Sequence, residues 1–229
     1  MTRYYDLHIH SCHSPCAGDD MTPANIAGMA HIKGLSLIAL TDHNAGANLP
    51  AMAAAAAEYG LVFVPGIEVT TSEEVHMLTY FADADTAFSF GSMLYASLPD
   101  IANRPEIFGN QLIMNAQDTV SGTLDKLLLQ AVPHSLDDIV RMARDAGGCA
   151  VPAHINRDSF SLFANLGYIP SGLFRCIEVA KSLPCPDVDS AYHILHSSDA
   201  HDLGTISEPL ETLCGIENAR DFVYFANNS

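Results

Sequence analysis

Short apolar segments that end in polar side chains recur along most of this chain of 229 residues, and helical patterns separate many of them. The expected strands are residues 6–10, 35–40, 61–64, 75–81, 149–155, 176–179 and 194–198. The expected helices are residues 22–33, 50–59, 135–146 and a shorter one at 158–166. Because alternating strands and helices are typical of a parallel sheet covered by helices, this order predicts an α/β protein built from βα units.

The segment 83–132 departs from this alternation. Four residues that break regular structure divide it into short helical and strand-like pieces, namely Pro99, Pro105, Gly109 and Gly122. Since the segment is short of a core of its own, we interpret it as an insertion that covers the site of a single domain spanning residues 1–229. The part after Gly204 is weakly patterned, and we expect it to be incompletely ordered.

The charge balance limits the partners of the protein. The chain has 27 acidic and 10 basic residues, with a formal net charge of −17 at pH 7. Such a surface repels a polyanion, and no basic stripe is present, so nucleic acid is an unlikely partner. A small phosphorylated substrate could still bind if multivalent cations lay between it and the protein. The oligomeric state is left open.

The apolar runs do not predict a membrane protein. They have the length of strands, well short of the 18 or more residues that a spanning helix needs. The residues after Met1 do not form the apolar region of a signal peptide, so a cytoplasmic location is expected. The six cysteines contain no CxxC pair; Cys12 and Cys16 are possible soft metal ligands, but most are expected to be buried thiols.

Polar residues with metal-binding side chains gather where the expected strands end. They are His8, His10, Asp42, His43, Glu68, His76, His154, Asp199 and His201, with Asp19 and Asp20 in the first loop. His8 and His10 are two residues apart, which places both rings on one face of a strand. Because strand ends converge on one face of a βα barrel, the set predicts a metal centre with more than one ion.

The ligand types narrow the choice of metal. Imidazoles with carboxylates, and no thiolate cluster, suit zinc, manganese or iron, with magnesium as a further option. A carboxylate such as Glu68 could bridge two ions, and pairs of ions about 3.5 to 4 Å apart are typical of phosphoester hydrolysis. The expected cofactors are therefore two or three divalent metal ions.

Five motifs in order carry a resemblance to a known family. They are the HxH of His8 and His10, TDHN at 41–44, GIEVTT at 66–71, PAHI at 152–155 and SSDAH at 197–201. Together they resemble the PHP family, the polymerase and histidinol phosphatase metal-dependent phosphoesterases, over residues 4–204. The resemblance implies a distorted TIM-like barrel of seven βα units, (β/α)7, with up to three metal ions at the C-terminal face of the strands.

The resemblance also implies three ligand sets. His8, His10, Glu68 and Asp199 would hold one ion. His43 and His201 would share a second ion with a ligand from the first loop, and Glu68, His76 and His154 would hold the third. The first loop of this chain is longer than in compact family members, and we favour Asp20 over Asp19 and His13 as its ligand.

The expected function is hydrolysis of a small phosphomonoester by a metal-activated water. Glu68, Asp199, His201 and Arg157 are the expected catalytic residues. Asp199 or His201 would protonate the leaving oxygen, and Arg157 would either clamp the phosphate or form a solvated salt bridge. Two alternatives stay open: a nuclease that acts on nucleic acid, and a non-catalytic interaction module stabilised by metal.

Overall fold

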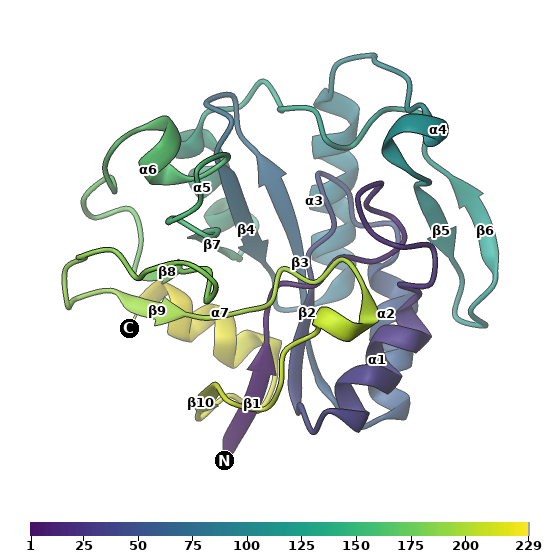
Figure 1. Ribbon diagram of the computed structural model, residues 1–229, viewed down its shortest axis with the longest axis horizontal. Coiled ribbons are helices and arrows are strands. Elements are labelled where there is room, and N and C mark those ends of the chain that lie inside the picture. Colours follow the sequence, from purple (N-terminus) through teal and green to yellow (C-terminus); the bar gives the residue numbers. More distant parts are fainter. Residues whose placement is uncertain (229) are drawn as a thin grey trace.

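The computed structural model describes residues 1–228 and contains one six-stranded sheet covered by helices (Figure 1). In spatial order the strands are β10 (Thr212–Cys214), β1 (Thr2–Asp6), β2 (Leu37–Leu40), β3 (Val62–Thr70), β4 (His76–Tyr80) and β7 (Cys149–Pro152). β1, β2 and β3 are parallel, whereas β4 is antiparallel to both β3 and β7. The predicted α/β class is confirmed, but β4 interrupts the expected run of parallel strands.

A second, two-stranded parallel sheet of β8 (Cys176–Glu178) and β9 (His193–Leu195) adjoins the first sheet. Just beyond β7, the Ile155 N–H donates to the Glu178 carbonyl at 2.9 Å. Beyond β9, the Ala200 carbonyl accepts from the His10 N–H, also at 2.9 Å. The sheet therefore curls, and the ends of β1, β7, β8 and β9 meet on one side of it.

Most helices begin at the capping signals that the sequence contains. α1 (Pro23–Ile32) has Thr22 as its N-cap and proline in its first turn. α5 (Leu136–Asp145) starts with a capping box formed by Ser135 and Asp138. The remaining helices are α2 (Leu49–Glu58), α3 (Ala84–Ser97), α4 (Pro105–Phe108), α6 (Leu162–Asn165), α7 (Ala219–Asn228) and a 3-10 turn at Leu203–Thr205. Within residues 1–228, no helix combines the length and the apolar character needed to cross a membrane.

Two expectations about secondary structure were wrong in detail. β1 ends at Asp6, so His8 and His10 lie on an extended continuation of the strand, not within it. The segment 83–132 holds a 14-residue helix, α3, whose Ala87, Phe90 and Leu94 are buried in the main core. Shorter pieces follow α3 as expected: α4, and a hairpin of β5 (Leu112–Met114) and β6 (Val120–Thr123).

Alternation along the strands creates two apolar layers. On β2, Ile38 and Leu40 belong to the cluster that also contains residues of α1, α2, α3 and α5. Leu37 and Ala39 point to the other face, where they join a second cluster that includes residues of α7. The expectation of incomplete order after Gly204 was wrong, because α7 is a regular helix docked on this face.

Phe222 is the central contact of α7. Its side chain is fully buried, and its ring meets the Tyr80 ring edge-on with centroids 5.1 Å apart. We expect Phe222→Ala to lower the free energy of unfolding by about 3–5 kcal/mol, because it leaves a cavity between α7 and the sheet. Urea unfolding midpoints would measure this loss. Tyr224→Ala on the same helix is the control, since Tyr224 is 71% exposed and should change the midpoint little; equal effects of the two variants would contradict the docking role of Phe222.

Candidate metal centre

The extended segment after β1 places two imidazoles side by side. Ile9, between them, bridges to Ala200 on one side, and its carbonyl accepts from the Thr41 N–H on the other. With the backbone held on both sides, the rings of His8 and His10 project to the same face, and their Nε2 atoms lie 3.2 Å apart. Both side chains are fully buried.

Glu68, near the end of β3, lies at the centre of the cluster and is 1% exposed. Five imidazoles each bring a ring nitrogen within 3.3 Å of one of its carboxylate oxygens, at 3.3 Å for His8, 3.2 Å for His10, 3.2 Å for His43, 2.9 Å for His76 and 3.2 Å for His154. His43 reaches it through a parallel bridge to Glu68, and His76 is the first residue of β4. Residues from β3, β4 and the ends of β1, β2 and β7 therefore converge on one carboxylate.

The segment after β9 completes the cluster. Asp199 Oδ1 lies 3.1 Å from Nε2 of both His8 and His10. The His201 ring stacks on the His10 ring with centroids 4.4 Å apart. Asp199 and His154 have positive φ angles of 53° and 26°, which are uncommon for residues other than glycine. Such backbone conformations persist where the surrounding contacts hold them, and they concentrate at functional sites.

Ligand atoms fall into three groups close enough to share an ion. They are His8, His10, Glu68 and Asp199; His10, His43 and His201; and His43, Glu68 and His76. The first group has the membership that we predicted. The other two contain the predicted His43, His201, Glu68 and His76, and His154 lies beside Glu68 without belonging to a group. Which of these side chains bind ions stays a prediction.

Unpaired buried atoms test whether the cluster suits metal ions. Nδ1 of His43, Nδ1 of His76 and Oδ1 of Asp199 are buried without a hydrogen bond, although each lies within 3.2 Å of a carboxylate oxygen or a ring nitrogen of the cluster. Buried polar atoms are normally satisfied, and an ion is one of the partners that can satisfy them. Several ring nitrogens and carboxylate oxygens of the cluster lie within reach of one common point, which fits a set of metal ligands.

The first loop does not bring its predicted ligand into the cluster. The Asp20 side chain is exposed and belongs to none of the three groups, so its assignment stays a prediction that the geometry does not support. Asp19 is also exposed and accepts from Asn110 Nδ2 at 2.8 Å. His13 is buried and its Nδ1 is 3.2 Å from the Leu112 carbonyl, outside the three groups.

Glu178 is a residue of the centre that our sequence reasoning missed. Its carboxylate oxygens lie 2.9 and 3.1 Å from His8 Nδ1, and Oε1 also accepts from the His154 N–H at 3.1 Å. A carboxylate on Nδ1 holds a neutral imidazole with its proton there, which leaves Nε2 free to bind a metal. The only signal in the sequence was a single charged residue within the expected strand 176–179.

Asp42 acts on the cluster through a hydroxyl group. Its Oδ1 accepts from the Ser14 hydroxyl at 2.7 Å, and Ser14 Oγ lies 3.0 Å from His10 Nδ1. Ser14 Oγ also accepts from the His43 N–H at 3.1 Å. Asp42 therefore orients the His10 ring through Ser14 and is not itself a member of the three ligand groups.

Electrostatics keep the carboxylates ionised. Burial alone would raise the pKa of Glu68, but His76, His8 and His43 outweigh it and hold that pKa well below the usual range. Burial likewise opposes ionisation of Asp199, and the charge of His8 with the hydrogen bond of His10 lowers its pKa. Both carboxylates are thus available as ligands at neutral pH. Desolvation and the charge of Glu68 raise the pKa of the Cys16 thiol, so a thiolate ligand is disfavoured there.

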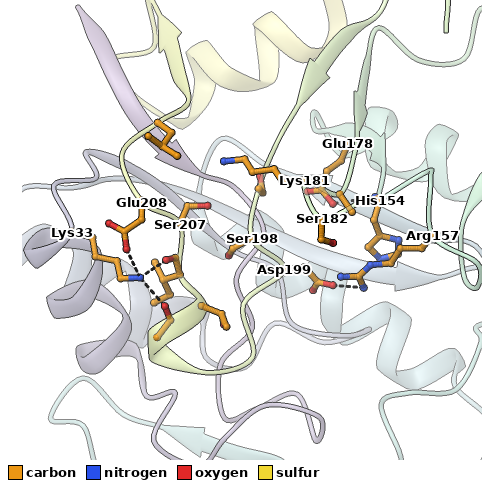
Figure 2. Close-up of a pocket in the computed structure, with 16 residues that line it drawn as sticks. Lys33, His154, Arg157, Glu178, Lys181, Ser182, Ser198, Asp199, Ser207 and Glu208 are labelled. Atoms are coloured by element: carbon orange, nitrogen blue, oxygen red, sulfur yellow. Dashed lines mark hydrogen bonds and ion pairs between the residues drawn. The ribbon is translucent and has the colours of Figure 1, made fainter. Parts of the chain in front are cut away.

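Two cavities meet at the cluster. One, of about 220 Å³, is lined by Cys16, His43, Glu68, His76, Leu129, Arg157, Phe160, Asp199 and His201. The other, of about 350 Å³, extends from His154, Arg157 and Asp199 past Ser182 and Ser198 to Lys33 (Figure 2). Arg157 and Asp199 line both cavities and form an ion pair at 2.6 Å. Lys33, at the far end, is occupied by Glu208 and by the carbonyls of Gly204 and Ile206.

A curled α/β sheet with a buried histidine–carboxylate centre at its strand ends defines a class of metal-binding domain, and comparison with known proteins identifies it. The family model described as PHP domain matches residues 6–146, more than half of the chain. The chain therefore belongs to the PHP family.

Two curated relatives match parts of the chain. A 5′-3′ exoribonuclease of Haemophilus influenzae is 34% identical over 74 residues, which are 32% of this chain and 26% of that protein. A 3′,5′-nucleoside bisphosphate phosphatase of Chromobacterium violaceum is 42% identical over 67 residues, which are 29% of this chain and 22% of that protein. The matches thus span about a quarter of the length of each relative.

The fold extends the likeness to the whole chain. The crystal structure of the lesion-specific endonuclease PfuEndoQ from Pyrococcus furiosus superposes with a TM-score of 0.70 at 19% identity. It covers 99% of this chain and 56% of the endonuclease chain. At this identity the likeness concerns the fold.

We expect Glu178→Gln to weaken manganese binding by about 10- to 100-fold, because the variant loses the charge that makes His8 a better ligand. Competition with a chromophoric chelator would measure the affinity. Glu217→Gln is a matched control, since Glu217 is exposed and pairs with Arg3 and the amino terminus. Unchanged affinity in Glu178→Gln would contradict the orienting role of Glu178.

The metal-free protein should lose stability as the pH rises. Burial alone would lower the pKa of His10, but hydrogen bonds to Asp199 and Glu68 raise it to about 9, and Glu178 with Asp199 likewise raises the pKa of His8. The stability from the His10 shift is complete below the unfolded pKa of about 6.5 and is lost as the pH rises through about 9, and the raised pKa of His8 acts in the same direction. Urea midpoints in chelator between pH 6.5 and 9.5 would measure the loss, and His10→Gln should reduce it; identical pH profiles for both proteins would exclude His10 as its source.

Proposed function

We propose that the chain is a metal-dependent phosphoesterase that hydrolyses small phosphomonoesters with two or three divalent ions. The supporting observation is Glu68, whose two carboxylate oxygens face five imidazoles while Asp199 faces two of the same rings. Manganese, zinc and iron suit this donor set, with magnesium as a further option. We further propose that the two sheets form the distorted (β/α)7 barrel and that the ions lie at its C-terminal face.

Bound ions would activate a water for attack on phosphorus and neutralise charge on the phosphoryl oxygens. Glu68 and Asp199 would help to hold the ions, and Asp199 Oδ2 also forms an ion pair with Arg157. The Arg157 side chain is 40% exposed, so its remaining N–H groups can bind a phosphate oxygen. We propose Asp199 or His201 as the group that protonates the leaving oxygen, because both side chains line the smaller cavity.

The size and charge of the protein favour a small substrate. The net charge of −17 opposes a polyanion, and the cavities at the cluster have volumes of about 220 and 350 Å³. The segment 83–132, proposed to cover the site, contributes Leu129 to the smaller cavity, and Asn44 binds the carbonyls of Leu128 and Gln130. The relative that is a nucleoside bisphosphate phosphatase supports a nucleotide-like phosphomonoester. A cytoplasmic location is part of the proposal.

Hydrolysis of nucleic acid is the second candidate. The exoribonuclease relative and the fold shared with a lesion-specific endonuclease support it. A panel of nucleotides, sugar phosphates and short oligonucleotides, assayed with manganese, would separate the two functions. Phosphate release from the monoesters alone supports the phosphatase, whereas chain cleavage supports the nuclease. A fully metal-loaded protein that acts on none of them would favour the third option, a non-catalytic module.

Glu68→Gln should remove activity and bound metal together. We expect release of phosphate from an aryl phosphate to fall by roughly a hundredfold or more, since even partners outside the ligand set are typically worth about 10- to 100-fold. Metal analysis of the same samples would show fewer bound ions. Glu58→Gln, at an exposed position of α2, is the control. Retained activity after complete loss of metal would overturn the proposal.

A further inference from the structure

The loop between β7 and α6 presents two side chains of different chemistry to the smaller cavity. Arg157 and Phe160 both line it, together with Glu68 and His76. Hydrogen bonds hold the loop at both ends, so its conformation is well defined. Asn156 exchanges hydrogen bonds with the backbone of Ala180, and the buried Ser161 donates to the Arg157 carbonyl at 2.7 Å.

Phe160 has a backbone conformation that needs support. Its φ of 52° is an outlier for a bulky residue, and such conformations concentrate at functional sites. The Phe160 carbonyl accepts from the His76 N–H at 2.9 Å, and the phenyl ring stacks on the His76 ring at 4.7 Å between centroids with 21° between planes. The loop therefore fixes both the backbone and the ring of Phe160.

The ring is placed at the cavity and not in the core. Phe160 is 41% exposed, whereas the large aromatic residues of the two apolar layers, such as Phe81 and Phe222, are fully buried. One face of the ring lies against His76, and Leu129 adds a second apolar side chain to the same cavity. An exposed aromatic surface beside an arginine matches a ligand that has both a flat ring and a phosphate.

We propose that Phe160 is a stacking platform for the nucleobase of a nucleotide whose phosphate lies at the metal cluster beside Arg157. This inference rests on the proposed phosphoesterase function and adds the substrate class, a nucleotide. Aromatic side chains bind bases of any sequence through their π-faces, so the platform selects for a base and not for one particular base.

Two probes with the same phosphate end test the platform: adenosine 5′-monophosphate, which has a base, and ribose 5-phosphate, which has none. Manganese-loaded wild-type protein should bind the nucleotide about tenfold more tightly, the range of one stacked base. Phe160→Ala should reduce this preference to about twofold or less, with the affinity for ribose 5-phosphate and the bound manganese unchanged. Alanine also tolerates a positive φ poorly, so this variant removes the ring while the backbone preference stays similar. Phe160→Tyr should keep the preference.

Tyr224→Ala, which removes an exposed aromatic side chain on α7, should bind both probes like the wild type. No preference in the wild type, or the same preference in Phe160→Ala, would overturn the proposal. An equal loss for both probes together with lost manganese would also overturn it, because the ring would then only support His76.

Kinetics and titration separate this proposal from the function on which it rests. Where the probes are hydrolysed, the preference is measured as the ratio of the two KM values, and Phe160→Ala should reduce this ratio to about twofold or less. Where they are not hydrolysed, calorimetric titration measures the same preference. Base-dependent binding without turnover would contradict the proposed phosphatase but support the stacking role of Phe160. Turnover without base dependence would support the phosphatase but contradict the stacking role.

Discussion

The structure depends on one buried carboxylate, Glu68, whose charge is stabilised by imidazoles. An ionised side chain at 1% exposure is costly to bury unless partners surround it. Five rings do so, and they come from four segments of the chain that lie as far apart as His8 and His154. The curl of the sheet brings these strand ends together, so the packing of the strands also places the rings around Glu68.

A second layer of polar contacts holds the rings that face Glu68. Glu178 fixes His8, and Asp42 acts on His10 through Ser14. Asp6, fully buried below them, accepts from the N–H groups of Ser198 and Ser207 and so ties the end of β1 to the segment that carries Asp199. These contacts fix the orientation of the rings, and a cluster oriented in this way suits strong binding of a ligand with little rearrangement.

The sequence predicted those strands and site residues that follow a local pattern, an apolar run with polar residues at its end. Apolar runs placed β2, β3 and β7, and the polar residues that follow such runs supplied nearly all members of the cluster. α7 was missed although its buried residues Ala219, Phe222, Val223 and Ala226 have the i, i+3, i+4, i+7 spacing of an amphipathic helix, so a local signal for it was present in the sequence. Glu178 was missed because its partner, His8, is 170 residues away, and only the fold brings them together. Asp20 illustrates the converse: a suitable residue type in the right loop says nothing of where the loop points its side chain.

The reversed direction of β4 has a consequence for how the centre is held. Thr70 at the end of β3 pairs with His76 at the start of β4, so only residues 71–75 separate two strands that both contribute side chains to the cluster. A regular βα unit would need a whole helix to return to the cluster. Glu68 and His76 therefore belong to one hydrogen-bonded hairpin, and their spacing is set by the sheet. Movements of the outer helices or of the segment 83–132 would reshape access to the cluster while the distance between these two side chains stays constant.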